Sequence, residues 1–199
     1  MNTHHIKRML TAVLMLISST QLAFAEIHNS NRYYFGAGIS STSLTIDSAN
    51  ASAIFSGHDE ITADENQASL ELLFGIKLDE YLTLEFGVAD LGKINAINNS
   101  QPTQLLSVSN FFIDTSLETK LSENISVFGK VGLSLWNTKL GHAKDSYEEG
   151  NGLLYGVGLD LNLYGGSNRK LRFEVKRYDF DSLYLEKADT ASMTLMLYF

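Results

Sequence analysis

The chain has 199 residues, of which 44% are apolar, 11% are aromatic and 19% are charged. This length suits one domain, and the apolar and aromatic content is too high for a disordered chain. A mean hydropathy of −0.04 excludes a polytopic helical membrane protein, which needs repeated runs of about 18 or more apolar residues. The absence of cysteine excludes a disulfide scaffold, a thiolate zinc site and a cysteine nucleophile, and the net charge of −8 disfavours a nucleic-acid partner.

Residues 1–25 have the pattern of a secretory signal peptide. Basic Lys7 and Arg8 precede an apolar stretch, and the small-x-small sequence Ala23-Phe24-Ala25 precedes Glu26. An uncleaved anchor helix is the alternative, but the apolar run is short for a membrane span. Cleavage would leave residues 26–199 as one domain of 174 residues (199 − 25), with a net charge of −10 (−8 − 2). We therefore expect an exported protein.

Apolar residues occupy every second position in most of the remaining chain. In a strand such residues share one face, and the opposite face here carries Gly, Ser and scattered charges. No amphipathic helical pattern accompanies them. The alternation predicts eight strands, at residues 32–43, 68–78, 81–91, 104–121, 125–139, 152–163, 171–178 and 190–199.

The connections between these strands alternate between short and long. Residues 79–80, 122–124 and 164–170 form the short connections; residues 44–67, 92–103, 140–151 and 179–189 form the long ones, and Pro102 falls in one of these. An up-and-down antiparallel barrel with tight turns at one end and free loops at the other has this arrangement. The predicted fold is therefore all-β, an eight-stranded antiparallel up-and-down barrel.

The polar face indicates which side of the barrel meets lipid. A soluble, lipocalin-like barrel places apolar residues inside, whereas a transmembrane β-barrel places them outside. A solvated exterior is normally dense in Lys and Glu, but the polar face here is rich in Gly. Small residues suit a narrow lumen, so the pattern favours the transmembrane barrel over the soluble periplasmic one.

Three stretches carry a resemblance to a known family: Leu82–Lys93 (LTLEFGVADLGK), Leu171–Phe180 (LRFEVKRYDF) and Met193–Phe199 (MTLMLYF). The chain resembles the small outer-membrane barrels of the OmpA-like transmembrane and OmpX-like type. The resemblance implies residence in the outer membrane of a Gram-negative bacterium. It also implies recognition by the barrel-assembly machinery through a C-terminal signal at Met193, Leu195, Leu197 and Phe199. OmpA continues into a peptidoglycan-binding domain, and because this sequence stops at Phe199 that role is not carried over.

Strand alternation directs a set of charged side chains into the lumen. These residues are Glu71, Glu85, Asp114, Glu118, Lys130, Asp160, Arg172, Glu174 and Lys176, with Lys77 and Lys120 on the same face. Charges in so narrow a space must pair or be hydrated. They predict either a static plug of ion pairs or, as the resemblance suggests, a gate whose ion pairs exchange to open a small conductance.

No enzyme or cofactor site is evident. A serine hydrolase needs a histidine base beside its nucleophile, and after cleavage only His28, His58 and His142 remain, none on the apolar wall where a lipid-modifying enzyme would meet an acyl chain. Gly36-Ala37-Gly38 feeds no helix and so is not a nucleotide loop. The sequence predicts no metal site and no cofactor.

The long loops and the outer wall offer surfaces for partners. Residues 44–67 hold five carboxylates and no Lys or Arg, which predicts an acidic rim that could also bind a divalent cation or a host or surface ligand. Outward Arg177 and Lys139 could contact lipopolysaccharide phosphates. The outward aromatic residues Tyr33, Phe111, Tyr155 and Phe199 suit the girdles at the membrane interfaces.

Overall fold

The computed structural model describes residues 32–47, 50, 60–63, 67–98, 101–140, 146–163 and 168–199. The predicted signal peptide and the three histidines lie outside these ranges. Within them, no helix is long and apolar enough to cross a membrane. The strands are β1 (Tyr33–Ile46), β2 (Glu60–Ala63), β3 (Gln67–Lys77), β4 (Leu82–Asn98), β5 (Gln101–Lys120), β6 (Ile125–Leu140), β7 (Ser146–Asn162), β8 (Arg169–Phe180) and β9 (Leu185–Tyr198).

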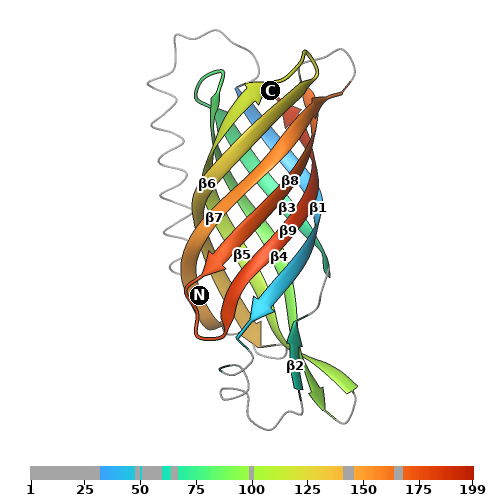
Figure 1. The fold of residues 1–199 in the computed structure, drawn as a ribbon, viewed down its shortest axis with the longest axis vertical. Helices are drawn as coiled ribbons and strands as arrows, with labels where there is room; N and C mark the ends of the chain where they lie inside the picture. The colour runs from blue at the N-terminus through green and yellow to red at the C-terminus, as the bar shows by residue number, and fades with distance from the viewer. Residues whose placement is uncertain are drawn as a thin grey trace. The chain divides into compact units, whose positions relative to one another are not determined.

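Eight of these strands form a closed antiparallel ring (Figure 1). The ring runs β1-β3-β4-β5-β6-β7-β8-β9 and closes through the pairing of β9 with β1. Every strand of the ring therefore has two hydrogen-bonded neighbours, which is the condition for a sheet to lie in lipid without unpaired backbone groups. The predicted all-β, eight-stranded antiparallel barrel is confirmed.

The register of the ring fixes how the strands slope. Starting at Ser43 and moving across each registered pair, the path returns to β1 at Tyr33, so the ring closes with a shift of 10 residues (43 − 33). The path passes through Asp189, Arg177, Tyr155, Val131, Thr115, Leu84 and Ile76. Because of this stagger the strands tilt, and every row of outward side chains descends obliquely along the wall.

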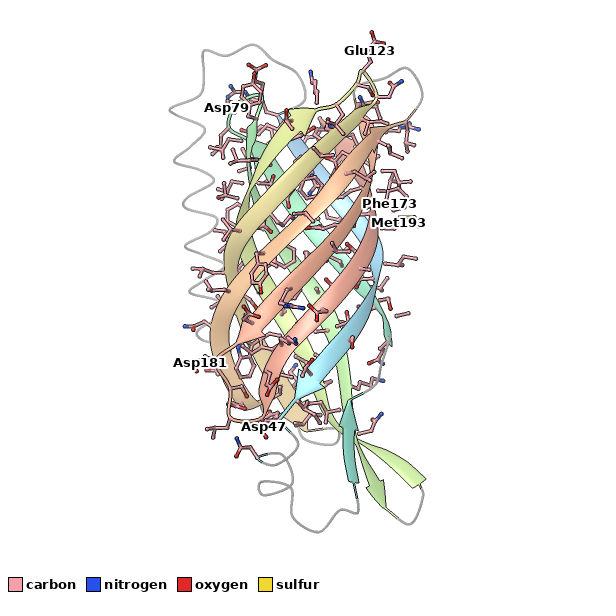
Figure 2. All side chains as sticks on the ribbon, viewed as in Figure 1. Asp47, Asp79, Glu123, Phe173, Asp181 and Met193 are labelled. Atoms are coloured by element: carbon pink, nitrogen blue, oxygen red, sulfur yellow. The ribbon has the colours of Figure 1, made fainter. Side chains whose placement is uncertain are left out.

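The two faces of the wall differ as the alternation predicts. Outward side chains on the central part of the strands are apolar and exposed, as Leu70 (69%) and Val157 (59%) show. Phe173 and Met193 point away from the barrel in Figure 2. Inward side chains are buried and mostly small, charged or aromatic. An apolar exterior around a polar interior is the arrangement of a transmembrane barrel.

Tight turns occupy one end of the ring, as expected. Figure 2 shows Asp79 and Glu123 at this turn end, and Asp47 and Asp181 at the opposite, loop end. In the β3–β4 turn, the Asp79 carboxylate accepts hydrogen bonds from the backbone N–H groups of Tyr81 and Leu82, both at 2.7 Å. These two donors lower the pKa of the Asp79 carboxyl group.

The loop end is more ordered than the sequence predicts. Residues 44–67 contain β2, which pairs with residues 94–97 of β4. Residues 92–103 are the tip of a hairpin whose strands continue to Asn98 and resume at Gln101, so Pro102 lies in a strand rather than in a loop. The prediction of long connections was wrong here, because these extensions alternate less clearly and carry many Asn, Gln and Thr residues.

A β-bulge at Leu91 and Gly92 marks the start of the β4 extension. Asp90 pairs with Ser109 and Gly92 pairs with Val108, so one residue of β4 is extra. Gly92 has φ +110°, which favours glycine, and its N–H donates to Asp90 at 3.0 Å. Leu91 and Ile94 consequently both face inward and are buried. They join a cluster of buried apolar residues that runs along the lumen, whose other members at the loop end are Leu44, Leu106, Val108, Leu154, Tyr184, Leu185 and Ala188.

Inward glycines and inward aromatic residues form pairs across neighbouring strands. The directly registered pairs are Tyr34 with Gly75, Phe112 with Gly87, Phe128 with Gly158 and Trp136 with Gly150. At each of these glycines a side chain would overlap the partner's ring. The glycines therefore make the space in which large rings lie flat against the wall, and this explains why the polar face is rich in glycine.

The glycine pairs predict position-dependent effects of added volume. Gly158→Val should lower the free energy of unfolding by about 1–3 kcal/mol, because an added Cβ would lie 2.5 Å from Cζ of the Phe128 ring and closer still to the Phe173 carbonyl oxygen. Gly129→Val is the matched control, since an added Cβ at outward Gly129 meets only the Gly156 carbonyl oxygen at 4.0 Å. Urea unfolding in lipid vesicles measures both. Equal losses in the two variants would contradict the pairing.

Candidate functional site

The charged lumen is the candidate site, and the predicted residues lie along its wall. Eight of the nine are buried, and Glu118 is partly buried with a side chain 9% exposed. Lys77, at the end of β3, is also partly buried. Lys120, the last residue of β5, is registered with inward Ser126 but is exposed at the turn end, so it lies at the mouth of the lumen rather than within it.

Ion pairs near the turn end involve a lysine that the sequence analysis missed. Lys170 lies 2.7 Å from Glu118 and 3.8 Å from Asp160. Lys77 lies 4.0 Å from Glu118 on its other side. We expected Lys170 to belong to a turn, although it is two residues before Arg172 and so continues the same inward row.

Arg172 holds the next part of the lumen together. Its Nε and a terminal nitrogen donate to the two Asp160 oxygens at 2.8 and 3.1 Å. Its other terminal nitrogen donates to Glu85 at 2.5 Å. Glu85 also accepts a hydrogen bond from the Tyr34 hydroxyl. A planar guanidinium between two carboxylates is a geometry that arginine favours over lysine.

Lys130 is the centre of the network. Its Nζ lies 2.6 Å from Glu85, 2.9 Å from Glu174 and 3.5 Å from Asp114. All four side chains are fully shielded from solvent. Neither carboxylate oxygen of Asp114 has a hydrogen-bond partner among the described residues. One cation thus faces three carboxylates from β4, β5 and β8.

Lys176 continues the chain of contacts toward the loop end. Its Nζ donates to Glu71 and lies 3.7 Å from Glu174. Through Glu174, Lys130, Glu85 and Arg172 the contacts join residues at the turn end to residues near the loop end. The carboxylates in this chain are Glu71, Glu85, Asp114, Glu118, Asp160 and Glu174, and the cations are Lys77, Lys130, Lys170, Arg172 and Lys176. The described network therefore has one carboxylate in excess.

Aromatic rings support the lumen cations. The Arg172 guanidinium lies 4.1 Å from the centre of the Phe128 ring, and Lys130 lies 5.6 Å from the same ring. Lys176 lies 5.1 Å from the centre of the Phe112 ring. Such cation–π contacts add attraction where water is excluded. Each of these two rings rests on its partner glycine, so the wall, the ring and the cation form layers.

This arrangement suits electrostatic closure better than metal chemistry. The described residues contain no group of three or more His, Asp or Glu side chains that could hold a metal ion. Although Glu85, Asp114 and Glu174 converge, the Lys130 ammonium occupies their common centre. The network can hold the lumen rigid, or it can change its pairing at Lys130.

The outer wall carries the other predicted residues. Met193, Leu195, Leu197 and Phe199 are exposed on it, between 41% and 63%. Tyr33 stacks between Phe74 and Phe199 at the turn end, with ring centres 6.2 and 6.3 Å apart. Toward the loop end, Arg177 forms a two-pronged ion pair with Asp189 at 2.6 and 3.0 Å. Lys139 is exposed on β6.

Comparison with known proteins agrees with this geometry. Residues 28–177 match the family model described as OmpA-like transmembrane domain. The chain belongs to this family. Its members form transmembrane barrels, and the match covers most of the ring.

Similar solved structures are small outer-membrane barrels. Neisserial surface protein A has 12% identity and a TM-score of 0.58, with 84% of this chain and 97% of that chain covered. The attachment invasion locus protein Ail of Yersinia pestis has 14% identity and a TM-score of 0.51, with coverages of 85% and 99%. The N-terminal barrel of Pseudomonas aeruginosa OprF has 9% identity and a TM-score of 0.53, with coverages of 85% and 100%. At these identities the likeness supports the fold alone. No curated protein sequence matches the chain significantly.

The network predicts that its centre stabilises the barrel. Lys130→Met should lower the free energy of unfolding by about 3–5 kcal/mol, because it leaves buried carboxylates without their cation. Lys120→Met, which removes the same charge from an exposed position, should change it by no more than about 0.5 kcal/mol. Urea unfolding in vesicles provides both values. Equal stability of the two variants would show that the network contributes nothing.

Proposed function

We propose that this outer-membrane barrel acts as a structural and surface-interaction protein with a closed lumen. The observation that carries the proposal is the continuous chain of buried ion pairs centred on Lys130. An eight-stranded barrel has only enough interior for side chains, so a chain of paired charges leaves little room for water. The buried apolar side chains near the loop end also fill the lumen there, which supports a lumen that is closed at two positions along the barrel.

A small gated channel is the alternative function. Lys130 supports it, because an ammonium group within 3.5 Å of three carboxylates can shift between them at little cost. Moving Lys130 away from Glu85 would leave Arg172 as the partner of that carboxylate. In this alternative the same ion pairs that close the lumen would open it when they exchange.

The proposed role is non-enzymatic and needs no cofactor. Its partners would be outer-membrane lipid and lipopolysaccharide at the wall, and the barrel-assembly machinery at Met193–Phe199. Loops on a rigid scaffold commonly carry recognition, so a host or surface ligand would bind at the acidic loops. Support for the insertion signal is the exposure of alternate apolar side chains from Met193 on β9 to Phe199, the residue that follows this strand.

Planar-bilayer recording of the refolded protein tests the closed lumen. The proposal predicts a heat-modifiable barrel that shows no discrete openings, because water cannot cross the paired lumen. Glu174→Gln with Lys176→Gln removes two lumen charges, and Arg177→Gln with Asp189→Asn is a matched control on the outer wall. Discrete wild-type openings that only the lumen variant alters would favour the gated channel instead. Openings that the outer-wall variant alters equally would argue against both readings of the lumen.

Export by a cleaved signal peptide is tested by the mass of the mature protein. The proposal predicts an outer-membrane fraction whose N-terminus is Glu26, since signal peptidase recognises the small residues at positions 23 and 25. Intact-mass measurement after membrane fractionation checks this, and Ala25→Leu should block cleavage. A protein that keeps residues 1–25 in the wild-type form would contradict the proposed processing.

A further inference from the structure

The outward side chains of five neighbouring strands form a furrow in the lipid-facing wall. One registered row consists only of small or β-branched residues: Ser41, Ala191, Val175, Val157 and Gly129. The adjacent row toward the turn end is bulky and consists of Ile39, Met193, Phe173 and Leu159. A groove of about 1000 Å³ follows the small row and continues past it to Leu117 on β5 and Leu82 on β4. The depression therefore arises from the sequence and the register together.

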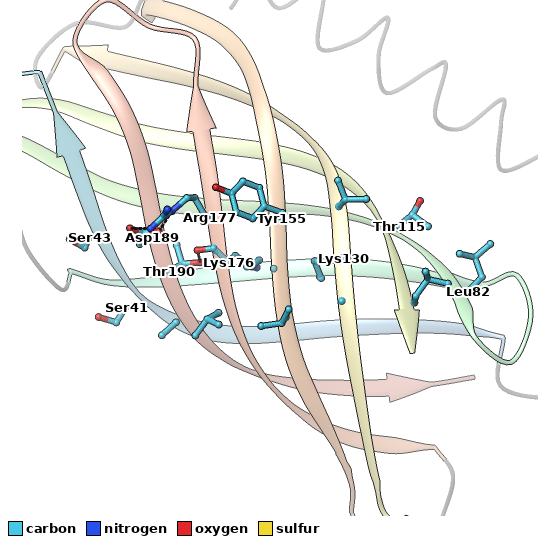
Figure 3. Close-up of a pocket in the computed structure, with 17 residues that line it drawn as sticks. Ser41, Ser43, Leu82, Thr115, Lys130, Tyr155, Lys176, Arg177, Asp189 and Thr190 are labelled. Atoms are coloured by element: carbon cyan, nitrogen blue, oxygen red, sulfur yellow. Dashed lines mark hydrogen bonds and ion pairs between the residues drawn. The ribbon is translucent and has the colours of Figure 1, made fainter. Parts of the chain in front are cut away.

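A polar cluster borders the furrow on the side of the loop end. Figure 3 shows Arg177 and Asp189 facing each other, with Tyr155 beside Arg177. Arg177 and Asp189 are 40% and 43% exposed, so the ion pair remains accessible from outside. Asp189 fixes the orientation of the guanidinium through two hydrogen bonds and leaves one terminal nitrogen of Arg177 unused by that pair.

The dimensions of the furrow match one leaflet of a membrane. From β1 to β6 its small row crosses four interstrand spacings, which makes a length of about 19 Å. One leaflet contributes half of a hydrocarbon core about 30 Å thick. Because the 10-residue stagger makes each row descend obliquely, a chain about 19 Å long in this furrow would extend through roughly one leaflet.

We propose that the furrow binds one lipid A molecule of lipopolysaccharide, with an acyl chain along the small row and the headgroup at Arg177 and Asp189. This rests on the proposed function, since it requires the loop end to lie in the outer leaflet. Lipid A carries phosphates that accept hydrogen bonds from Arg177, and amide and hydroxyl groups that donate to Asp189. Because Asp189 already balances the charge of Arg177, a headgroup that both accepts and donates fits better than a bare phosphate.

Native mass spectrometry of the refolded barrel with lipid A tests the proposal. We expect one bound lipid A, with the apparent Kd raised about tenfold by Arg177→Gln, through loss of a charge-assisted hydrogen bond. Val157→Trp and Gly129→Ile each fill the furrow and should weaken binding similarly. Val88→Trp, on the outer wall of β4 and 48% exposed, is the matched control and should leave binding unchanged.

Other occupants of the furrow give different results. Equal retention of phosphatidylethanolamine or phosphatidylglycerol would overturn the assignment to lipid A. A dimer that Val157→Trp abolishes would assign the furrow to a second copy of the chain. A barrel that is heat-modifiable and resides in the outer membrane but binds no lipid A would overturn this inference and leave the proposed function intact. A chain that does not reach the outer membrane would overturn the proposed function itself.

Discussion

Closure of the ring between β1 and β9 is the constraint on which the rest of the structure depends. A backbone N–H or C=O group left unpaired in lipid costs several kcal/mol, so the strands must pair on both edges. Once the ring closes with a shift of 10 residues, each side chain has a fixed side and level. The outward apolar wall, the inward charges and the furrow between rows all follow from that one register.

The narrow lumen created by closure is filled in layers. A glycine on one strand gives room for an aromatic ring on the next, and the ring carries a cation on its other face. Gly158, Phe128 and Arg172 form one such layer, and Gly87, Phe112 and Lys176 form another. The carboxylates then complete the charge balance between layers. The lumen is therefore held by coupled contacts, so replacing one member disturbs packing and electrostatics together.

The sequence predicted the eight ring strands and the inward set of charges because side chains alternate between the two faces of a strand with a period of two. This alternation does not depend on how the strand is registered with its neighbours. It did not predict which charges meet. The Arg172–Glu85 contact joins β8 to β4 across the lumen and depends on the stagger, which no local pattern contains. Lys170 was missed because it follows a turn-like stretch. The extension of β4 was missed because the bulge at Gly92 breaks the alternation that identified the other strands. β2 was missed because it has only four residues, too few to show an alternation.

The wall of the barrel changes its character between its middle and its loop end. In the middle, outward Val157 and Leu133 are apolar while inward Lys130 and Asp160 are charged. At the loop end the inward residues Leu44 and Ile94 are apolar and buried, whereas the outward residues Asp90, Ser107, Lys139 and Lys187 are polar. The middle of the ring thus has the apolar exterior of a transmembrane barrel, and the loop end has the apolar interior of a soluble barrel. The sequence analysis treats these two arrangements as alternatives, but both occur in one ring. Because buried apolar side chains form a core inside the ring at this level, continuous with the apolar residues further along the lumen, β2 and the β4–β5 hairpin extend a sheet that is already packed from within. That core gives the surface connections a rigid base, which is the physical requirement for a barrel whose function lies at its loops.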